Sequence, residues 1–131
     1  MISLAVTNVY VDDQDKALAF YTGVLGFKLK RDIPVGGAAR WLTVVPADDP
    51  DGVELLLEPN GSAIARSYQS ALNDAGLPTH TVLLSDDIAA EHARMLEAGV
   101  KFVMNPTRMG PATQAVFEDT CGNLLMLIQV H

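Results

Sequence analysis

The stretch VDDQDKALAFYTGVLGF, residues 11–27, decides the fold because its pattern is written twice in the chain. An acid that can cap a helix comes first, an apolar stripe at helical spacing follows, and a glycine ends the stripe. The second copy reads SDDIAAEHARMLEAGVKF. Asp13 stands 13 positions before Gly26, and Asp86 stands 13 positions before Gly99. The spacing therefore predicts two helices at equivalent places of a duplicated unit.

Apolar runs typical of strands surround both helices, in the same order in each half. The expected strands are 3–11, 27–33, 40–46, 52–59, 80–85, 100–104, 113–119 and 123–130. Each half thus runs strand, helix, strand, strand, strand. Residues 105–111 are expected to form a loop, and residues 61–77 a linker that carries a short helix. Module one then covers about 1–60 and module two about 78–131.

Composition restricts the class of protein. The 131 residues are enough for about one domain with a sizeable core. The formal net charge is −7 and the nine Lys and Arg residues are scattered, which argues against a nucleic acid partner. No apolar run reaches the roughly 18 residues of a membrane span, and the N-terminus lacks the basic start of a signal peptide. A single cysteine, Cys121, excludes an internal disulfide. We therefore expect a cytoplasmic protein with no nucleic acid and no membrane partner.

Two stretches carry a resemblance to a known family. VDDQDKALAFYTGVLGF is similar to the strand–acid–helix signature of the vicinal oxygen chelate superfamily, which includes glyoxalase I, extradiol dioxygenases and bleomycin resistance proteins. FEDTCGNLLML, residues 117–127, is similar to the C-terminal hairpin of that superfamily. The resemblance runs from about Leu4 to Val130. It implies an α+β fold, in which residues 1–131 form a single glyoxalase-like domain of two βαβββ modules whose curved mixed sheets form a concave cup.

The resemblance also implies where a metal would be held. Metal-dependent members of the family place ligands on the first and the last strand of each module. Counting from the helix-starting acids and the turn glycines puts these four corners at Val6, Leu56, His80 and Met126. One histidine among four corners does not hold a hard divalent ion, which needs oxygen or imidazole donors. We therefore expect no cofactor.

A weaker alternative pairs His80 with Glu58 as metal ligands. Because side chains alternate along a strand, Glu58 shares a face with Leu56, and a register slip of two residues would bring it to the corner. Two protein ligands still fall short of the three usual in a catalytic site. Without a metal, His80 is either a partly buried histidine hydrogen-bonded to a neighbour, or a cavity-lining group that exchanges a hydrogen bond or a proton with a ligand.

Four further residues are candidates for ligand binding. Asn8 and Tyr10 share one face of the first strand, the face of the corner position, so both point into the cup if that position does. Trp41 either stacks on a flat or cationic ligand or fills the core, and its neighbour Arg40 must face the opposite way. Gln114 lies on the expected seventh strand and faces either the cup or water.

Several other residues are expected to have no part in a site. His92, within a helix among charged residues, and the terminal His131 are expected on the surface. Cys121 is expected to be an exposed thiol in a hairpin turn, without a histidine near it in sequence that would activate it. Asp86 and Asp87 are expected to cap the second helix rather than act as paired catalytic carboxylates.

These observations predict a small-molecule-binding protein, similar to bleomycin-resistance-type sequestering proteins, that lacks the chelating metal. Its acidic charge suits a cationic or polar ligand. One alternative is a divalent-metal-dependent glyoxalase-like lyase or an extradiol-type dioxygenase. A second is a metal-free lyase or isomerase with His80 as general base. We also expect a homodimer, partly because the resemblance implies one and partly because curved sheets leave edges and an open face that a second chain would cover.

Overall fold

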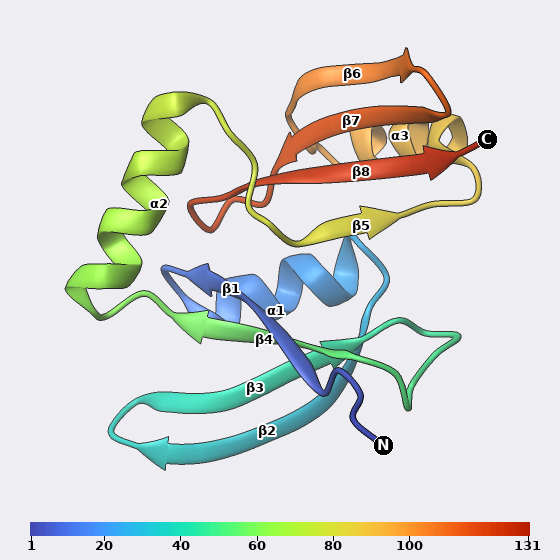
Figure 1. Cartoon of the computed structure of the whole chain (residues 1–131). Coiled ribbons are helices and arrows are strands. Elements are labelled where there is room, and N and C mark those ends of the chain that lie inside the picture. Colours follow the sequence, from blue (N-terminus) through green and yellow to red (C-terminus); the bar gives the residue numbers. More distant parts are fainter.

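The computed structural model describes the whole chain, Met1 to His131, as two βαβββ modules joined by a helix. The elements of module one are β1 (Val6–Val11), α1 (Gln14–Gly23), β2 (Lys28–Gly36), β3 (Ala39–Val45) and β4 (Glu54–Pro59). The connecting helix is α2 (Ala63–Ala75). The elements of module two are β5 (Val82–Leu84), α3 (Ile88–Glu97), β6 (Phe102–Met109), β7 (Ala112–Glu118) and β8 (Leu124–Val130). Module one is the lower half of Figure 1, module two is the upper half, and α2 stands at their left side.

Each module forms an open, mixed four-stranded sheet. The strand order is β1-β4-β3-β2 in the first sheet and β5-β8-β7-β6 in the second. The first and the last strand of each module pair in parallel, and all other neighbours are antiparallel. The predicted fold class, with its duplicated order of elements, is confirmed. None of the three helices is long and apolar enough to cross a bilayer.

Acids begin both module helices, as the sequence predicts. Asp13 accepts a hydrogen bond from the N–H of Lys16 at 3.0 Å, and Asp87 accepts one from Ala90 at 3.0 Å. Each bond satisfies one of the free N–H groups in the first turn of its helix. Of the pair Asp86-Asp87, only Asp87 is the cap. The Asp86 carboxylate is left exposed to solvent.

Both sheets turn their helix-bearing faces to one shared core. A cluster of 17 buried hydrophobic residues draws on both modules. Within it the ring of Phe20 on α1 lies 6.4 Å, centroid to centroid, from the ring of Phe117 on β7. Because strand side chains alternate, Val9 is buried on the core side of β1 while Asn8 is exposed on the other side. The faces that point away from the core are called the outer faces below.

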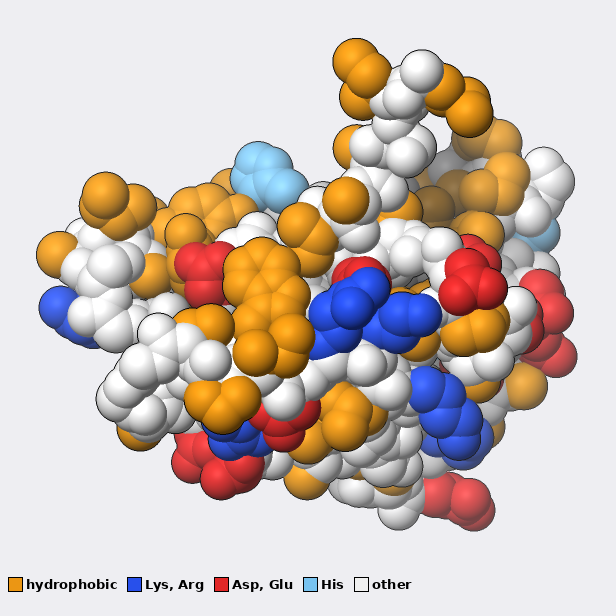
Figure 2. Space-filling view, turned by 90° about the horizontal axis from the view of Figure 1, so that it is seen from below, with side chains coloured by type: hydrophobic (Ala, Val, Ile, Leu, Met, Phe, Trp, Pro, Cys, Tyr) orange, Lys and Arg blue, Asp and Glu red, His pale blue; other side chains and the backbone are white.

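The outer faces are defined by alternation and by the strand register. On the first sheet the outer face carries Asn8, Tyr10, Trp41, Thr43, Leu56 and Glu58. On the second sheet it carries Val82, Leu84, Gln114, Val116, Met126 and Ile128. Seen from the β2 side, the surface shows hydrophobic patches between charged groups (Figure 2).

Several elements differ from the sequence prediction. β1 begins at Val6 rather than at residue 3, and β5 covers only Val82–Leu84 of the expected strand 80–85, so His80 precedes the strand that it was expected to begin. The sequence predicts a loop at residues 105–111, but β6 continues to Met109. β6 is an edge strand whose register is irregular between Met104 and Thr107, so Pro106 removes no hydrogen bond from the interior of the sheet. The linker helix α2 is also not short: its 13 residues exceed the 10 of each module helix.

A buried hydrogen-bond network joins the two modules. The Tyr21 hydroxyl of α1 donates to Asp119 Oδ2 at 2.7 Å. Asp119 follows β7, and it also accepts from the N–H groups of Cys121 at 2.7 Å and Asn123 at 3.0 Å and from the Asn123 side chain at 2.7 Å. Tyr21 and Asp119 have no exposed surface. Burial, together with the nearby carboxylate, raises the pKa of Tyr21 well above its ordinary value, so the phenol remains a hydrogen-bond donor at neutral pH.

Removal of the Tyr21 hydroxyl tests this network. We expect Tyr21→Phe to lower the free energy of unfolding by about 1–3 kcal/mol, because the buried Asp119 carboxylate loses a donor that no water can replace. Urea denaturation measures the change. Tyr68→Phe is the matched control, because the Tyr68 hydroxyl makes no hydrogen bond within the chain. An equal loss of stability in both variants would contradict a special role for Tyr21.

Candidate ligand-binding site

A hollow of about 300 Å³ lies where the edge strands of the two sheets meet. β1 forms one wall, α2 forms the second, and residues 79–81, which lead into β5, form the third. The Thr81 hydroxyl donates to the Asn8 carbonyl oxygen at 3.1 Å and ties the two edges together. The lining residues are Thr7, Asn8, Val9, Tyr10, Ile64, Tyr68, Thr79, His80 and Thr81. We call this recess the His80 hollow.

Gln69 holds α2 in place beside the hollow. Its Nε2 donates to the Tyr10 carbonyl oxygen at 2.9 Å and to Asn123 Oδ1 at 3.1 Å, and its Oε1 accepts from Asn60 at 2.8 Å. Gln69 is buried, so these bonds are shielded from water. The neighbouring side chain, Tyr68, is thereby fixed over Tyr10.

Three rings line the hollow in series. The rings of Tyr10 and Tyr68 meet edge to face with centroids 5.9 Å apart, and the rings of Tyr68 and His80 are 6.2 Å apart. His80 is exposed, and its ring makes no hydrogen bond within the chain. The interpretation of His80 as a partly buried, hydrogen-bonded histidine is therefore wrong. Its ring nitrogens are free to donate to or accept from a ligand.

The hollow also contains a polar atom without a partner. Thr79 is only 7% exposed, and its Oγ1 has no hydrogen-bond partner. Its backbone is fixed, because the Thr79 N–H donates to the Leu124 carbonyl oxygen at 2.8 Å. A buried hydroxyl without a partner costs roughly 1–3 kcal/mol. Because that oxygen has almost no accessible surface, a ligand in the hollow does not reach it without a rearrangement of the wall.

Three of the predicted residues come together in the hollow, and three do not. Asn8, Tyr10 and His80 line it. Glu58 stands beside Tyr10 in the β1–β4 register but does not line the hollow. The remaining candidates lie on the outer faces away from it: Trp41 on the first sheet, and Gln114 on the second.

Arg40 and Trp41 of β3 face opposite sides of the first sheet, and the strand register shows which side each one takes. Arg40 points to the side of α1, where its guanidinium pairs with Asp15 at 2.7 Å and with Asp32 at 3.1 Å. Trp41 consequently lies on the outer face, opposite Ile33 of β2, and is 39% exposed. It is therefore not a core tryptophan.

Sequence reasoning missed Thr79 and Tyr68. Tyr68 belongs to the linker helix, and Thr79 lies in the segment between that helix and β5. Neither position belongs to the duplicated pattern. No periodicity in the sequence marks Thr79, because its burial comes from the packing of α2 and β1 around it.

The donor residues of the chain do not fit a catalytic metal. No group of three or more His, Cys, Asp or Glu side chains gathers close enough to hold an ion. Val6, Leu56 and Met126, at three of the four expected corners, offer no oxygen or imidazole donor. His80 lines a hollow that Glu58 does not reach. The pair therefore does not form the beginning of a three-ligand site.

Two surface assignments are wrong and one is confirmed. Cys121 is fully buried, and burial raises the pKa of its thiol to about 12, with the charge of Asp119 adding to the effect. His92 is half-buried, with its ring 4.6 Å from that of Phe102. His131 is exposed, and its Nε2 lies 2.7 Å from the Thr113 hydroxyl.

A duplicated βαβββ unit with two open four-stranded sheets defines the glyoxalase-like class of folds. The sequence matches the Glyoxalase/Bleomycin resistance protein/Dioxygenase superfamily over residues 3–127, and the chain belongs to this family.

Relatives and solved structures agree with this assignment. The chain is 49% identical to Uncharacterized protein YurT of Bacillus subtilis (strain 168), over 98% of this chain and 99% of that protein. The crystal structure of UcmS2 is 35% identical, with a TM-score of 0.82 and 98% of each chain covered. TnmS3, an antibiotic binding protein from Streptomyces sp. CB03234, is 30% identical, with a TM-score of 0.79 over 100% of this chain and 98% of that chain.

The thiol of Cys121 gives a direct test of the buried network. We expect Ellman's reagent at pH 8 to leave the folded protein almost unmodified, because only a thiolate reacts and a pKa of about 12 keeps the thiol protonated. The same thiol should react at once in guanidinium chloride, which serves as the control. Equal rates in the folded and the unfolded chain would contradict the burial of Cys121.

Proposed function

We propose that this protein binds a small molecule in the His80 hollow without a chelating metal, in the manner of a sequestering protein of the bleomycin resistance type. The observation that carries the proposal is the His80 ring, which is exposed in the hollow, makes no hydrogen bond within the chain and stands in series with the rings of Tyr68 and Tyr10. The description of the similar protein TnmS3 as antibiotic binding supports the same role.

The lining of the hollow indicates the chemistry of the ligand. The three rings offer flat surfaces on which an aromatic group can pack at an offset or edge to face. His80 and Asn8 offer an imidazole and an amide to polar atoms of the ligand. A volume of about 300 Å³ is at the lower end of the range for small-molecule sites. We therefore propose a ligand, or part of one, that is planar and carries hydrogen-bonding groups.

The same lining disfavours an enzyme with His80 as general base. No carboxylate lines the hollow, so no acidic side chain there orients the His80 ring or stabilises its protonated form. The metal-dependent alternatives need at least three donors at one point, and no three His, Cys, Asp or Glu side chains gather in the chain. Binding needs neither feature.

We further propose that the protein is a homodimer whose outer faces meet across two chains. Leu84 is 73% exposed on the second sheet, and Trp41 and Ile33 are exposed side by side on the first. The backs of both sheets already share one core, so these apolar faces cannot cover one another within one chain. A second copy would cover them and join Trp41 and Glu58 of one chain to Gln114 of the other.

Two substitutions test the hollow, one through stability and the other through binding. We expect Thr79→Val to raise the free energy of unfolding of the ligand-free protein by roughly 1 kcal/mol, because it removes an unpaired buried hydroxyl. We expect His80→Gln to weaken ligand binding by about 1–3 kcal/mol, as for a lost polar contact, with the fold intact. A thermal-shift screen of planar bicyclic aromatic alcohols and amines finds the ligand, and calorimetry measures its affinity.

His131→Gln is the control for this test, because His131 is exposed and far from the hollow in the fold. Unchanged affinity in His80→Gln would contradict the proposed site. A stoichiometric divalent ion in protein purified without chelator would contradict the metal-free part of the proposal.

The dimer is tested by sedimentation velocity at micromolar concentration. We expect the wild-type protein to sediment as a dimer and Ile33→Lys to sediment as a monomer, because a charge on the outer face beside Trp41 opposes burial. Leu96→Lys is the matched control, since Leu96 is an exposed leucine on α3, outside both outer faces. A monomeric wild-type protein would contradict the proposal.

A further inference from the structure

We infer that the cleft between the two modules is a second binding site, which takes an organic cation with an apolar body. The intermodule cleft has a volume of about 640 Å³, within the usual range of small-molecule sites. It shares no lining residue with the His80 hollow, which lies at the other end of β5. This inference therefore does not depend on the function proposed for the hollow.

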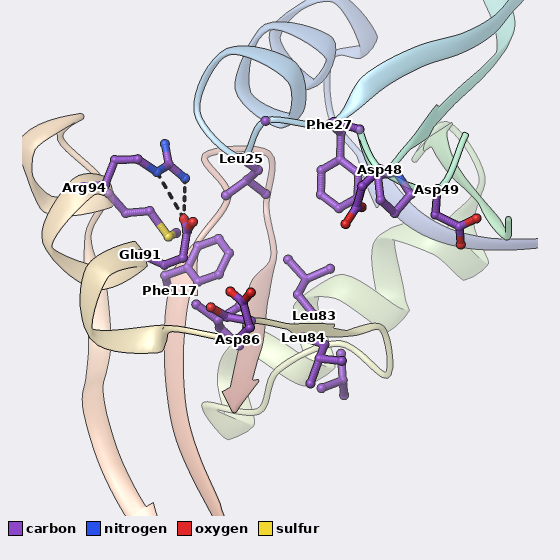
Figure 3. Close-up of a pocket in the computed structure, with 17 residues that line it drawn as sticks. Leu25, Phe27, Asp48, Asp49, Leu83, Leu84, Asp86, Glu91, Arg94 and Phe117 are labelled. Carbon is purple, nitrogen blue, oxygen red and sulfur yellow. Dashed lines mark hydrogen bonds and ion pairs between the residues drawn. The ribbon is translucent and has the colours of Figure 1, made fainter. Parts of the chain in front are cut away.

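The walls of the intermodule cleft are apolar and come from both modules. Leu25 and Phe27 follow α1, and they face Leu83 of β5 across the cleft, with Phe117 behind (Figure 3). Leu25, Phe27 and Leu83 are half-buried and pack against the shared core, so their remaining surface is the surface that faces the cleft. An apolar body placed here gains the free energy of burying that surface.

Three carboxylates without a partner surround these walls. Asp48 and Asp49 lie in the turn between β3 and β4, and Asp86 follows β5. Figure 3 shows Asp86 on one side of the cleft and Asp48 and Asp49 on another. None of the three takes part in an ion pair within the chain.

Arg94, the one cationic side chain that lines the cleft, is already paired within the chain. The Arg94 guanidinium donates to the Glu91 carboxylate at 2.6 and 3.1 Å and to the Val24 carbonyl oxygen at 2.7 Å. The dashed lines of Figure 3 mark its bonds to Glu91. Arg94 therefore neutralises Glu91 and leaves the charge of Asp48, Asp49 and Asp86 uncompensated.

Apolar walls with an uncompensated negative rim select the chemistry of the occupant. The three carboxylates are exposed, so they attract a positive charge through water, with a strength that salt reduces. A metal ion is not the occupant, because no three acidic side chains gather at one point. An anion would be repelled, and a neutral apolar molecule would gain nothing from the rim. An organic cation satisfies both features.

Two probes of equal shape and opposite charge test the inference. Tetraphenylphosphonium and tetraphenylborate are titrated into the wild-type protein by calorimetry at low salt and again in 1 M NaCl. We expect the phosphonium ion to bind more tightly than the borate, and its affinity to fall at high salt, because salt screens the carboxylates. Equal affinities for the two probes, or no binding of the phosphonium ion, would overturn the inference.

Substitutions locate the site. We expect Asp48→Asn/Asp86→Asn to weaken binding of tetraphenylphosphonium by about three- to tenfold, as for the loss of two partly exposed charge interactions. The matched control is Asp74→Asn/Glu97→Gln, which removes two exposed carboxylates outside the cleft and should leave the affinity unchanged. His80→Gln should also leave it unchanged. An equal effect of the two double variants would overturn the inference.

Discussion

The buried carboxylate of Asp119 is the constraint on which the arrangement of the two modules depends. It lies in the turn between β7 and β8, yet it accepts a hydrogen bond from the hydroxyl of Tyr21, which belongs to the helix of the other module. A buried charge of this kind is tolerated only when hydrogen bonds satisfy it, and four donors do so here. Asn123 is bonded to the same carboxylate. Its side chain also donates to the Tyr10 carbonyl oxygen of β1 and accepts from Gln69 of α2. One polar network therefore sets the angle between the modules and the position of the linker helix.

This arrangement determines which surfaces remain available for binding. Because α1 and α3 share a core, the helix-bearing faces of the sheets are filled. On the outer faces Thr43, Leu56 and Val116 are buried, and the exposed residues around them are left to solvent or to a partner. The edge strands β1 and β5 meet where Thr81 bonds to Asn8, and α2 is fixed beside them by Gln69, which produces the His80 hollow. At the other end of β5 no helix fills the gap between the modules, and the intermodule cleft remains. Both recesses thus follow from the way in which the two modules pack against each other.

The sequence predicts the fold well because duplication doubles every local signal. The equal spacing from Asp13 to Gly26 and from Asp86 to Gly99 marks both helices, and alternation marks the strands. The same reasoning finds the site residues on β1, since alternation places Asn8 and Tyr10 on one face. It does not predict the burial of Thr79 and Cys121, because that burial depends on α2 and on the network around Asp119. The distance of Trp41 and Gln114 from the hollow depends on how the modules pack, and no local pattern encodes that packing.

The asymmetry of the hollow explains how one duplicated chain acquires a single such site. Val6 and His80 occupy equivalent positions in the two modules, as do Leu56 and Met126, and of these four corners only His80 carries a metal-ligand side chain. Tyr68, which forms one wall of the hollow, comes instead from the linker helix, which is not duplicated. The modules therefore supply the sheets, their meeting edges, Asn8 and His80, while the linker supplies the wall beside them. Substitutions of Ile64 and Tyr68, which line the hollow and are not buried, can change what it binds and leave the Gln69 bonds that hold α2 in place.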